Sequence, residues 1–442
     1  MSAAGKLLFL IGLGASYRIS LVGQIGISEI FVFLWAPFIF SEEYPLLRRN
    51  GFGTYFTLLF LTLLGCIVAS VINHSPFSFF LRGFAQIYSL FAGVVVFHSL
   101  LRKEPQAIRW LALGLGVSGL LSFVLRGGDI SFDFDMTRGG MKAFSRMSVL
   151  SKAVNAPIAG WYFDIPLGYS SLAPILFGII CLATSASGRS LALTMMGTGV
   201  LAFVGKKNMS KVVGISKHFT QFCISIIVIL FLFKTAYVYS ARRGYLGELS
   251  RIKIEHQTRG KNGTFALLMG GRPEFFSGVY VALKKPILGF GPWAFDTEGY
   301  EEEFYEKYAT QSAYEDFLRG TSLMKESGYT RIVSGHSHLI GFWSWYGIFG
   351  LFFWIYVLWQ LYMLFRKNIG YLPVFFGFVC VYAPFGFWSI LFSPFSQRMQ
   401  TAALITVVLL MNNEGRKRRL GMAGGYGENE VTYVQRGRRR RG

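Results

Sequence analysis

The sequence has little cysteine, and its four cysteines are not arranged for cross-linking. Cys66, Cys181, Cys223 and Cys380 stand singly within apolar runs, and no CxxC or Cys/His spacing occurs. Disulfide frameworks and zinc sites need paired thiols or sets of thiols and imidazoles. Neither is expected, and the four side chains are predicted to be small buried hydrophobic groups.

Acidic residues are also scarce: 23 Asp and Glu face 44 Lys and Arg, a net charge of +21. In a soluble protein this excess would suggest nucleic acid. Here it lies in short loops and in the C-terminal tail, while the polar segment 240–335 is nearly balanced. Short basic loops mark the cytoplasmic side of membrane proteins, and a basic tail beside a span attracts anionic head groups. We expect membrane lipids, and no nucleic acid, as the partner of these charges.

Outside 240–335 and the tail, apolar runs dominate the sequence, and 52% of all residues are hydrophobic. Apolar runs of about 17–25 residues are typical of transmembrane helices. They predict an all-α polytopic membrane protein with roughly 11–12 transmembrane helices. Arg18 and Glu29 interrupt the first two runs, which could instead form one long span and a half-helix. The runs lie near 7–23, 25–40, 54–72, 79–100, 107–125, 170–186, 189–205, 219–239, 339–365, 371–391 and 398–412.

The runs divide the chain into N-terminal transmembrane helices (1–239), a large loop (240–335), C-terminal transmembrane helices (336–412) and a basic, disordered tail (413–442). Helical spacing of charges and aromatics predicts helices over 274–284 and 301–318 within the loop. If the tail is cytoplasmic, alternation places the loop on the extracytoplasmic side.

Sidedness stays open upstream of the loop. Basic residues at 48–49, 102–109 and 126–152 fit no single alternation of the predicted spans. A re-entrant or interfacial helix within 144–164 would restore the alternation.

Two glycine motifs imitate nucleotide-binding loops. Gly114-Leu-Gly116-Val-Ser-Gly119 matches the dinucleotide fingerprint but lies inside an apolar span with no preceding strand. Close packing of helices on small residues explains it better. Gly289-Phe-Gly291 lacks the Lys and Ser/Thr of a phosphate loop and is predicted to be a turn.

Three side chains at the predicted outer face are the candidate site. Arg189 lies between two apolar runs, Arg272 follows two glycines and precedes a proline, and His336 stands where the loop re-enters the membrane. The alternatives are a snorkelling anchor, a surface charge and an unpaired interfacial histidine. Two guanidinium groups can bind a diphosphate, and a neutral imidazole can accept a proton from an attacking hydroxyl.

His338 is an alternative base. The pair His336/His338 could also suggest a metal, but residues two apart on a helix point to different sides and no third ligand is near. No metal and no cofactor are expected.

Three stretches resemble the O-antigen ligase family of bacterial membrane enzymes, which includes O-antigen ligases and polysaccharide polymerases. Ser185–Leu193 is similar to its Arg-x-x-x-Leu segment. Gly271–Gly291 is similar to its Gly-Arg…Pro-x-x-Gly-x-Gly block, the most specific of the three. His336–Gly347 is similar to its His-Asn-x-x-Leu…Gly block, with Ser337 in place of the usual Asn. The spacing to Gly347 favours His336 over His338 as the functional histidine. The likeness spans about residues 170–365.

The resemblance implies a metal-independent, inverting glycosyltransferase of the bacterial inner membrane whose active site faces the periplasm. Its donor would be a glycan on undecaprenyl diphosphate, and its acceptor lipid A-core or a second lipid-linked glycan. Arg189 and Arg272 would bind the diphosphate, and His336 would act as the base. Trp293, Tyr300, Phe304, Tyr305 and Tyr308 could stack on sugars or pack within the loop. The rival is a transporter or flippase of lipid-linked oligosaccharide, which would carry ionisable residues at mid-membrane.

Overall fold

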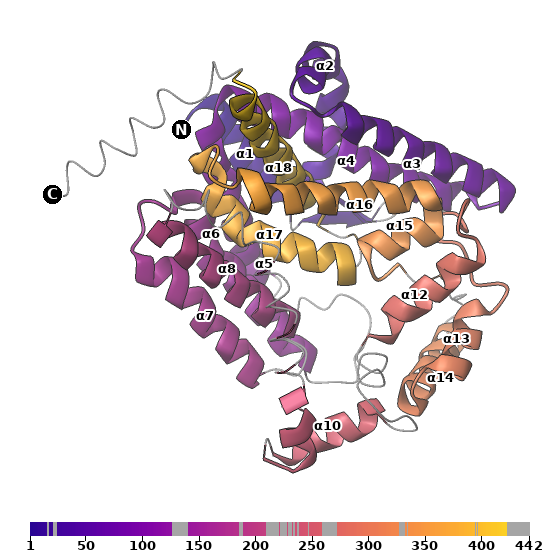
Figure 1. The fold of residues 1–442 in the computed structure, drawn as a ribbon. Helices are drawn as coiled ribbons and strands as arrows, with labels where there is room; N and C mark the ends of the chain where they lie inside the picture. The colour runs from indigo at the N-terminus through magenta and orange to yellow at the C-terminus, as the bar shows by residue number, and fades with distance from the viewer. Residues whose placement is uncertain are drawn as a thin grey trace.

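The computed structural model describes residues 1–421 apart from 16, 21–23, 126–139, 185–188, 209–220, most of 222–237, 246, 259–271, 327–331, 334, 394 and 396. The first half of the described chain contains α1 (Ala3–Gly14), α2 (Ile27–Arg49), α3 (Gly53–Ile72), α4 (Phe77–Lys103), α5 (Ile108–Leu125), α6 (Gly140–Trp161), α7 (Leu167–Thr184) and α8 (Arg189–Asn208). The second half contains α10 (Glu248–Thr258), α12 (Pro273–Lys284), α13 (Tyr300–Tyr308), α14 (Gln311–Glu326), α15 (His338–Tyr346), α16 (Ile348–Met363), α17 (Phe376–Phe392) and α18 (Arg398–Arg419). Figure 1 shows α16 and α17 in the centre, α3 and α4 above them toward the upper right, and α12, α13 and α14 grouped at the lower right.

The described chain is mainly helical and includes one short β-hairpin, and several of its helices fit a membrane. Five are long and apolar enough to cross one, judged by length and composition. They are Ile27–Arg49, Gly53–Ile72, Phe77–Lys103, Ile348–Asn368 and Pro373–Phe392. The helix content, lengths and compositions agree with the prediction of an all-α, multi-pass membrane protein. The predicted span 219–239 lies mostly outside the described residues.

Two predicted spans are wrong. The run 7–23 does not form one helix: α1 ends at Gly14, and β1 (Arg18–Ser20) pairs antiparallel with β2 (Gln24–Gly26). The run 339–365 forms two helices that turn at Gly347, where φ is +68°. A Cβ there would lie 1.9 Å from the Ile287 carbonyl oxygen, so only glycine fits the turn.

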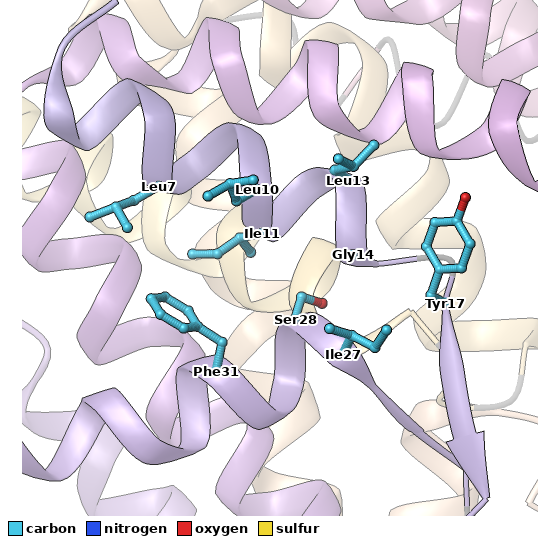
Figure 2. Close-up of a pocket in the computed structure, with 9 residues that line it drawn as sticks. All are labelled: Leu7, Leu10, Ile11, Leu13, Gly14, Tyr17, Ile27, Ser28 and Phe31. Carbon is cyan, nitrogen blue, oxygen red and sulfur yellow. The ribbon is translucent and has the colours of Figure 1, made fainter.

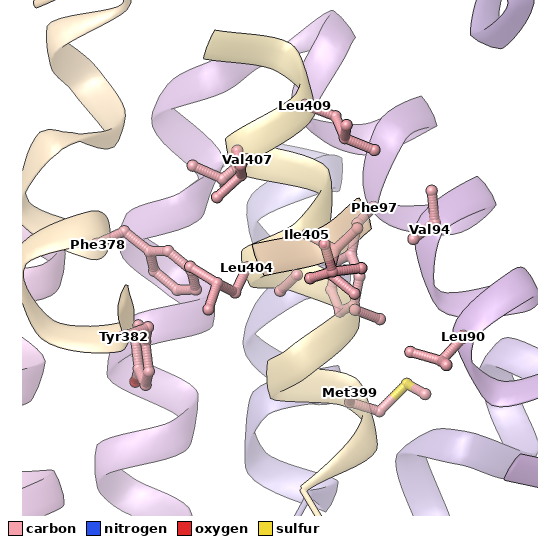
Figure 3. Close-up of a cluster of buried hydrophobic side chains, with 14 of the residues drawn as sticks. Leu90, Val94, Phe97, Phe378, Tyr382, Met399, Leu404, Ile405, Val407 and Leu409 are labelled. Carbon is pink, nitrogen blue, oxygen red and sulfur yellow. The ribbon is translucent and has the colours of Figure 1, made fainter. Parts of the chain in front are cut away.

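Helix α18 lies at the centre of the bundle, between α4 and α17. Figure 3 shows Leu404 and Ile405 of α18 among side chains of both neighbouring helices. Gly93 of α4 permits the close approach, because a Cβ there would lie 2.6 Å from the Ala402 Cβ. Four basic residues end α18, which explains why a helix with so buried a first half has a low mean hydropathy.

Tight packing on glycine also explains the apparent dinucleotide fingerprint. A Cβ at Gly114 would lie 2.3 Å from the Phe9 carbonyl oxygen in α1, and one at Gly116 would lie 2.7 Å from Ala156 in α6. The motif is therefore a helix-packing surface, as predicted.

Basic residues gather at one end of the bundle, which we call the basic end. They lie at the ends of α2, α4 and α18 and in the π-helical turn Leu364–Asn368 that follows α16. They comprise Arg48, Arg49, Arg102, Lys103, Arg366, Lys367 and Arg416–Arg419. Side chains link three of these helices: Arg102 Nη2 lies 3.2 Å from Glu43 Oε1, and Lys417 Nζ lies 3.1 Å from Asn50 Oδ1.

Helix α6 lies where a re-entrant or interfacial helix is predicted, but it packs lengthwise against α5. It covers most of the predicted range 144–164 and runs antiparallel to α5, since Gly116 faces Ala156 and Gly160 faces Arg109. Lys206 Nζ near the end of α8 donates 2.9 Å to the carbonyl oxygen of Tyr162, just after α6. Because α6 adds one crossing between α5 and α7, α8 ends on the same side of the bundle as α2 and α4.

Candidate functional site

Arg272 stands immediately before α12 with its side chain exposed. Pro273 occupies the first helical position, which suits its missing N–H and fixed φ. The Arg272 guanidinium lies over the ring of Trp388 in the last turns of α17, 5.4 Å from its centroid. Among the described residues, no carboxylate forms an ion pair with Arg272. Its charge is held near α17 but not neutralised there.

His336 and His338 differ sharply in environment. His336 is exposed, whereas His338 is 2% exposed and begins α15. The His338 ring lies 4.9 Å from both Trp354 and Phe395, centroid to centroid. Only His336 has the access to solvent that a base for an external hydroxyl needs.

Ser337 anchors the segment between the two histidines. Its hydroxyl accepts a hydrogen bond of 3.2 Å from the backbone N–H of Ile340, which caps α15. The same hydroxyl donates 2.9 Å to the carbonyl oxygen of Ile390 in the last turn of α17. The start of α15 is therefore fixed to the end of α17, the same end that Arg272 contacts. We call this end, Trp388–Phe392, the site end.

Arg189 is the first residue of α8, and the packing of α8 on α17 shows which end it approaches. Gly197 of α8 faces Pro384, and Gly205 faces Phe376, so the two helices run antiparallel in equal steps of eight residues. Arg189 lies eight residues before Gly197, and Phe392 lies eight residues after Pro384. The same register therefore places the backbone of Arg189 opposite Phe392 at the site end. The Arg189 side chain lies outside the described part.

Three separate elements thus begin or turn at the site end of α17. Phe275 of α12 packs there as well, with its ring 5.5 Å from that of Phe392. The backbone positions of Arg189, Arg272 and His336 are far apart in the sequence, and α17 is the helix against which all three elements pack.

The glycines at 289 and 291 form a turn, as predicted. Their φ angles are +73° and +87°. The N–H groups of Phe290 and Gly291 donate to the carbonyl oxygens of Ser344 and Trp345 at 2.7 and 3.0 Å. The turn therefore attaches the loop to the C-terminal end of α15.

The polar loop has a core and charge network of its own. Phe304, Tyr305 and Phe317 are buried together across α13 and α14. Hydrogen bonds from Lys307, Tyr280 and Lys284 lower the pKa of Glu303 to about 2. The predicted helix 274–284 corresponds to α12, while 301–318 forms two helices, α13 and α14, rather than one.

Most of the aromatics that could stack on sugars pack internally, the alternative favoured for most of them. Trp293 stacks on Trp345 at 4.7 Å, and Phe304 and Tyr305 are buried. Tyr308 is 48% exposed, and its ring lies 5.6 Å from that of Tyr280.

Sequence reasoning missed two features of the site end. One is Trp388, an aromatic residue within an apolar run that gives no local signal. The other is the ion pair between Arg398 at the start of α18 and Glu29 in the first turn of α2, at 2.9 Å. The sequence shows Glu29 only as a charge within an apolar run, because its partner is more than 300 residues away.

No protein-family model matches the chain, and neither a curated protein nor a solved structure shows significant similarity to it.

Proposed function

We propose that this protein is a membrane glycosyltransferase that moves a glycan from a lipid diphosphate to an acceptor hydroxyl. The observation that carries the proposal is the convergence of the Arg272, His336 and Arg189 positions on the site end of α17. The resemblance to the O-antigen ligase family supports undecaprenyl diphosphate as the carrier lipid, with lipid A-core or a second lipid-linked glycan as acceptor.

The leaving group determines the role of the arginines. As the bond between the anomeric carbon and the phosphate oxygen breaks, negative charge grows on the diphosphate. A guanidinium without a competing carboxylate stabilises that charge, and a second guanidinium from Arg189 would share it. Arg272 meets this requirement within the described residues, because its guanidinium lies over the ring of Trp388 and its N–H groups are not paired with a carboxylate.

His336 acts as the base. Its imidazole takes the proton of the acceptor hydroxyl as the oxygen attacks the anomeric carbon, and the diphosphate leaves from the opposite face. This single displacement inverts the anomeric configuration. Ser337 fixes the backbone next to His336 against α17, which limits the positions that the imidazole can take.

The distribution of charge supports an orientation in the membrane. The basic end meets the positive-inside rule for the cytoplasmic side. The site end then faces the opposite side, the periplasm of a bacterial inner membrane.

The buried ionisable groups argue against the transporter alternative. A transporter would place them at mid-membrane on broken helices. Here His98 and Glu43 pair at 2.8 Å close to the basic end, and Glu29 and Arg398 pair at the start of their helices. Each pair joins helices near an end of the bundle.

The test is a reconstitution of the purified protein in vesicles with undecaprenyl-diphosphate-linked glycan, with and without lipid A-core, in chelator. The proposal predicts glycan transfer, either to lipid A-core or onto the lipid-linked chain. An absence of transfer with both acceptors, together with movement of the lipid across the vesicle, would replace the enzyme with a transporter.

A further inference from the structure

A cavity of about 720 Å³ lies between α2, α3 and α4, and we call it the aromatic groove. Stacked rings of α4 form its floor: Phe84 and Tyr88 are 5.7 Å apart, and Tyr88 and Phe91 are 5.8 Å apart. Phe91 contacts Phe40 of α2 at 5.0 Å and Phe56 of α3 at 5.7 Å, so both walls meet the floor. Along α3 the groove runs from Gly53 to Leu63, about 15 Å at the helical rise.

One end of the groove is cationic. Arg48 lines it with an exposed side chain, at the basic end of the bundle. Within the described part of the chain, no hydrogen bond or ion pair involves Arg48, whereas Arg102 is paired with Glu43. Helix α3 begins at the same place, at Gly53, without a side-chain cap, and its first N–H groups add positive potential.

The pocket between α1 and α2 provides a contrast. It has a volume of about 500 Å³, and Figure 2 shows leucine, isoleucine and phenylalanine side chains around Ser28. None of its lining residues is charged. The combination of an apolar channel with an arginine at its end belongs to the aromatic groove.

We propose that the aromatic groove binds an anionic glycerophospholipid, with one acyl chain along the α4 rings and the phosphate at Arg48. An acyl chain matches the apolar, aromatic lining, and an unpaired guanidinium in the head-group region matches a phosphodiester. This site is independent of the proposed glycosyl transfer, because it lies at the opposite end of the bundle from Arg272 and His336.

The test uses the purified full-length protein after delipidation, titrated with phosphatidylglycerol or phosphatidylcholine of the same acyl chains and followed by native mass spectrometry. The parent protein is expected to prefer phosphatidylglycerol. Arg48→Gln weakens its binding about fivefold, the equivalent of about 1 kcal/mol for one charge at the membrane surface. Arg49→Gln is the matched control: it removes an adjacent exposed arginine that does not line the groove, and leaves binding unchanged. Thr57→Trp, which fills the groove from an exposed position, abolishes retention of the lipid.

Three results would overturn the site. Equal losses for Arg48→Gln and Arg49→Gln would reduce the effect to general surface charge. Retention of an apolar lipid without head-group preference would assign the groove to another occupant. A dimer that dissociates in Thr57→Trp would assign it to a second copy of the chain.

Discussion

The Ser337 hydroxyl donates a hydrogen bond of 2.9 Å to the carbonyl oxygen of Ile390 and thereby joins two segments that lie 53 residues apart. The same oxygen caps α15 through the N–H of Ile340. The residue after His336 thus fixes the histidine segment to the site end of α17. Ser337 thus performs two tasks with one hydroxyl.

Replacing Ser337 by Ala removes both hydrogen bonds. We expect a loss of about 1–2 kcal/mol in stability from the missing cap and the unsatisfied Ile390 carbonyl. Glycan transfer falls as well, because His336 loses its fixed neighbour. Ser344→Ala is the control, since the Ser344 hydroxyl bonds only within its own helix. Thermal unfolding and transfer rates of the two variants should differ; equal rates would remove Ser337 from the positioning of the site.

The two histidines should separate activity from stability. His336→Ala is expected to lose transfer by about 10²–10⁴-fold with little change in unfolding temperature, because the side chain is exposed and acts as a base. His338→Ala removes a ring packed between Trp354 and Phe395 and should lower the unfolding temperature. Transfer that survives in His336→Ala and disappears in a well-folded His338→Ala would move the base to His338.

The register of α8 on α17 predicts a cross-link. In a background in which the native cysteines are replaced by alanine, cysteines at 189 and 392 should be joined by a short bifunctional reagent. Cysteines at 205 and 392 should not, because 16 helical residues correspond to about 24 Å. Gel mobility after cross-linking provides the measurement. The reverse pattern would show that Arg189 does not approach the site end.

Gly347 and Gly299 differ both in crowding and in backbone conformation, since ψ is −155° at Gly347 and +21° at Gly299. Both have positive φ, +68° and +71°, but a Cβ would meet the Ile287 carbonyl at Gly347 and nothing within 4 Å at Gly299. Gly299→Ala should cost about 1 kcal/mol, the usual cost of the left-handed conformation. Gly347→Ala should cost more, because the turn between α15 and α16 must open. Chemical denaturation that gives equal losses would contradict the tight turn.

The sequence predicts the apolar helices well, because hydrophobic runs such as those of α3 and α4 follow directly from the cost of burying polar backbone in lipid. It does not predict where a run reverses. Gly347 looks like any glycine in an apolar stretch, and only its contact with Ile287, 60 residues earlier, makes it a turn. Likewise α6 was expected only from charge alternation, since its polar residues conceal it from hydropathy.

In the candidate site too, the sequence predicts residues in local motifs but not those whose role depends on distant contacts. Arg272 and His336 are recognisable from their places in local motifs. Trp388 is not, because its role depends on the packing of α12 against α17. Long-range pairs such as Glu29 and Arg398 lack any local signal.

One comparison tests whether Arg272 stabilises the departing diphosphate. Transfer rates of Arg272→Ala and Arg319→Ala are measured in vesicles with equal amounts of inserted protein. Arg319 is an exposed arginine of α14 in the same loop and serves as the control. We expect the transfer rate of Arg272→Ala to fall about 10²–10³-fold, as it does when other donors that stabilise a transition-state anion are removed. The rate of Arg319→Ala should not change. A parental rate in Arg272→Ala would contradict this role of Arg272.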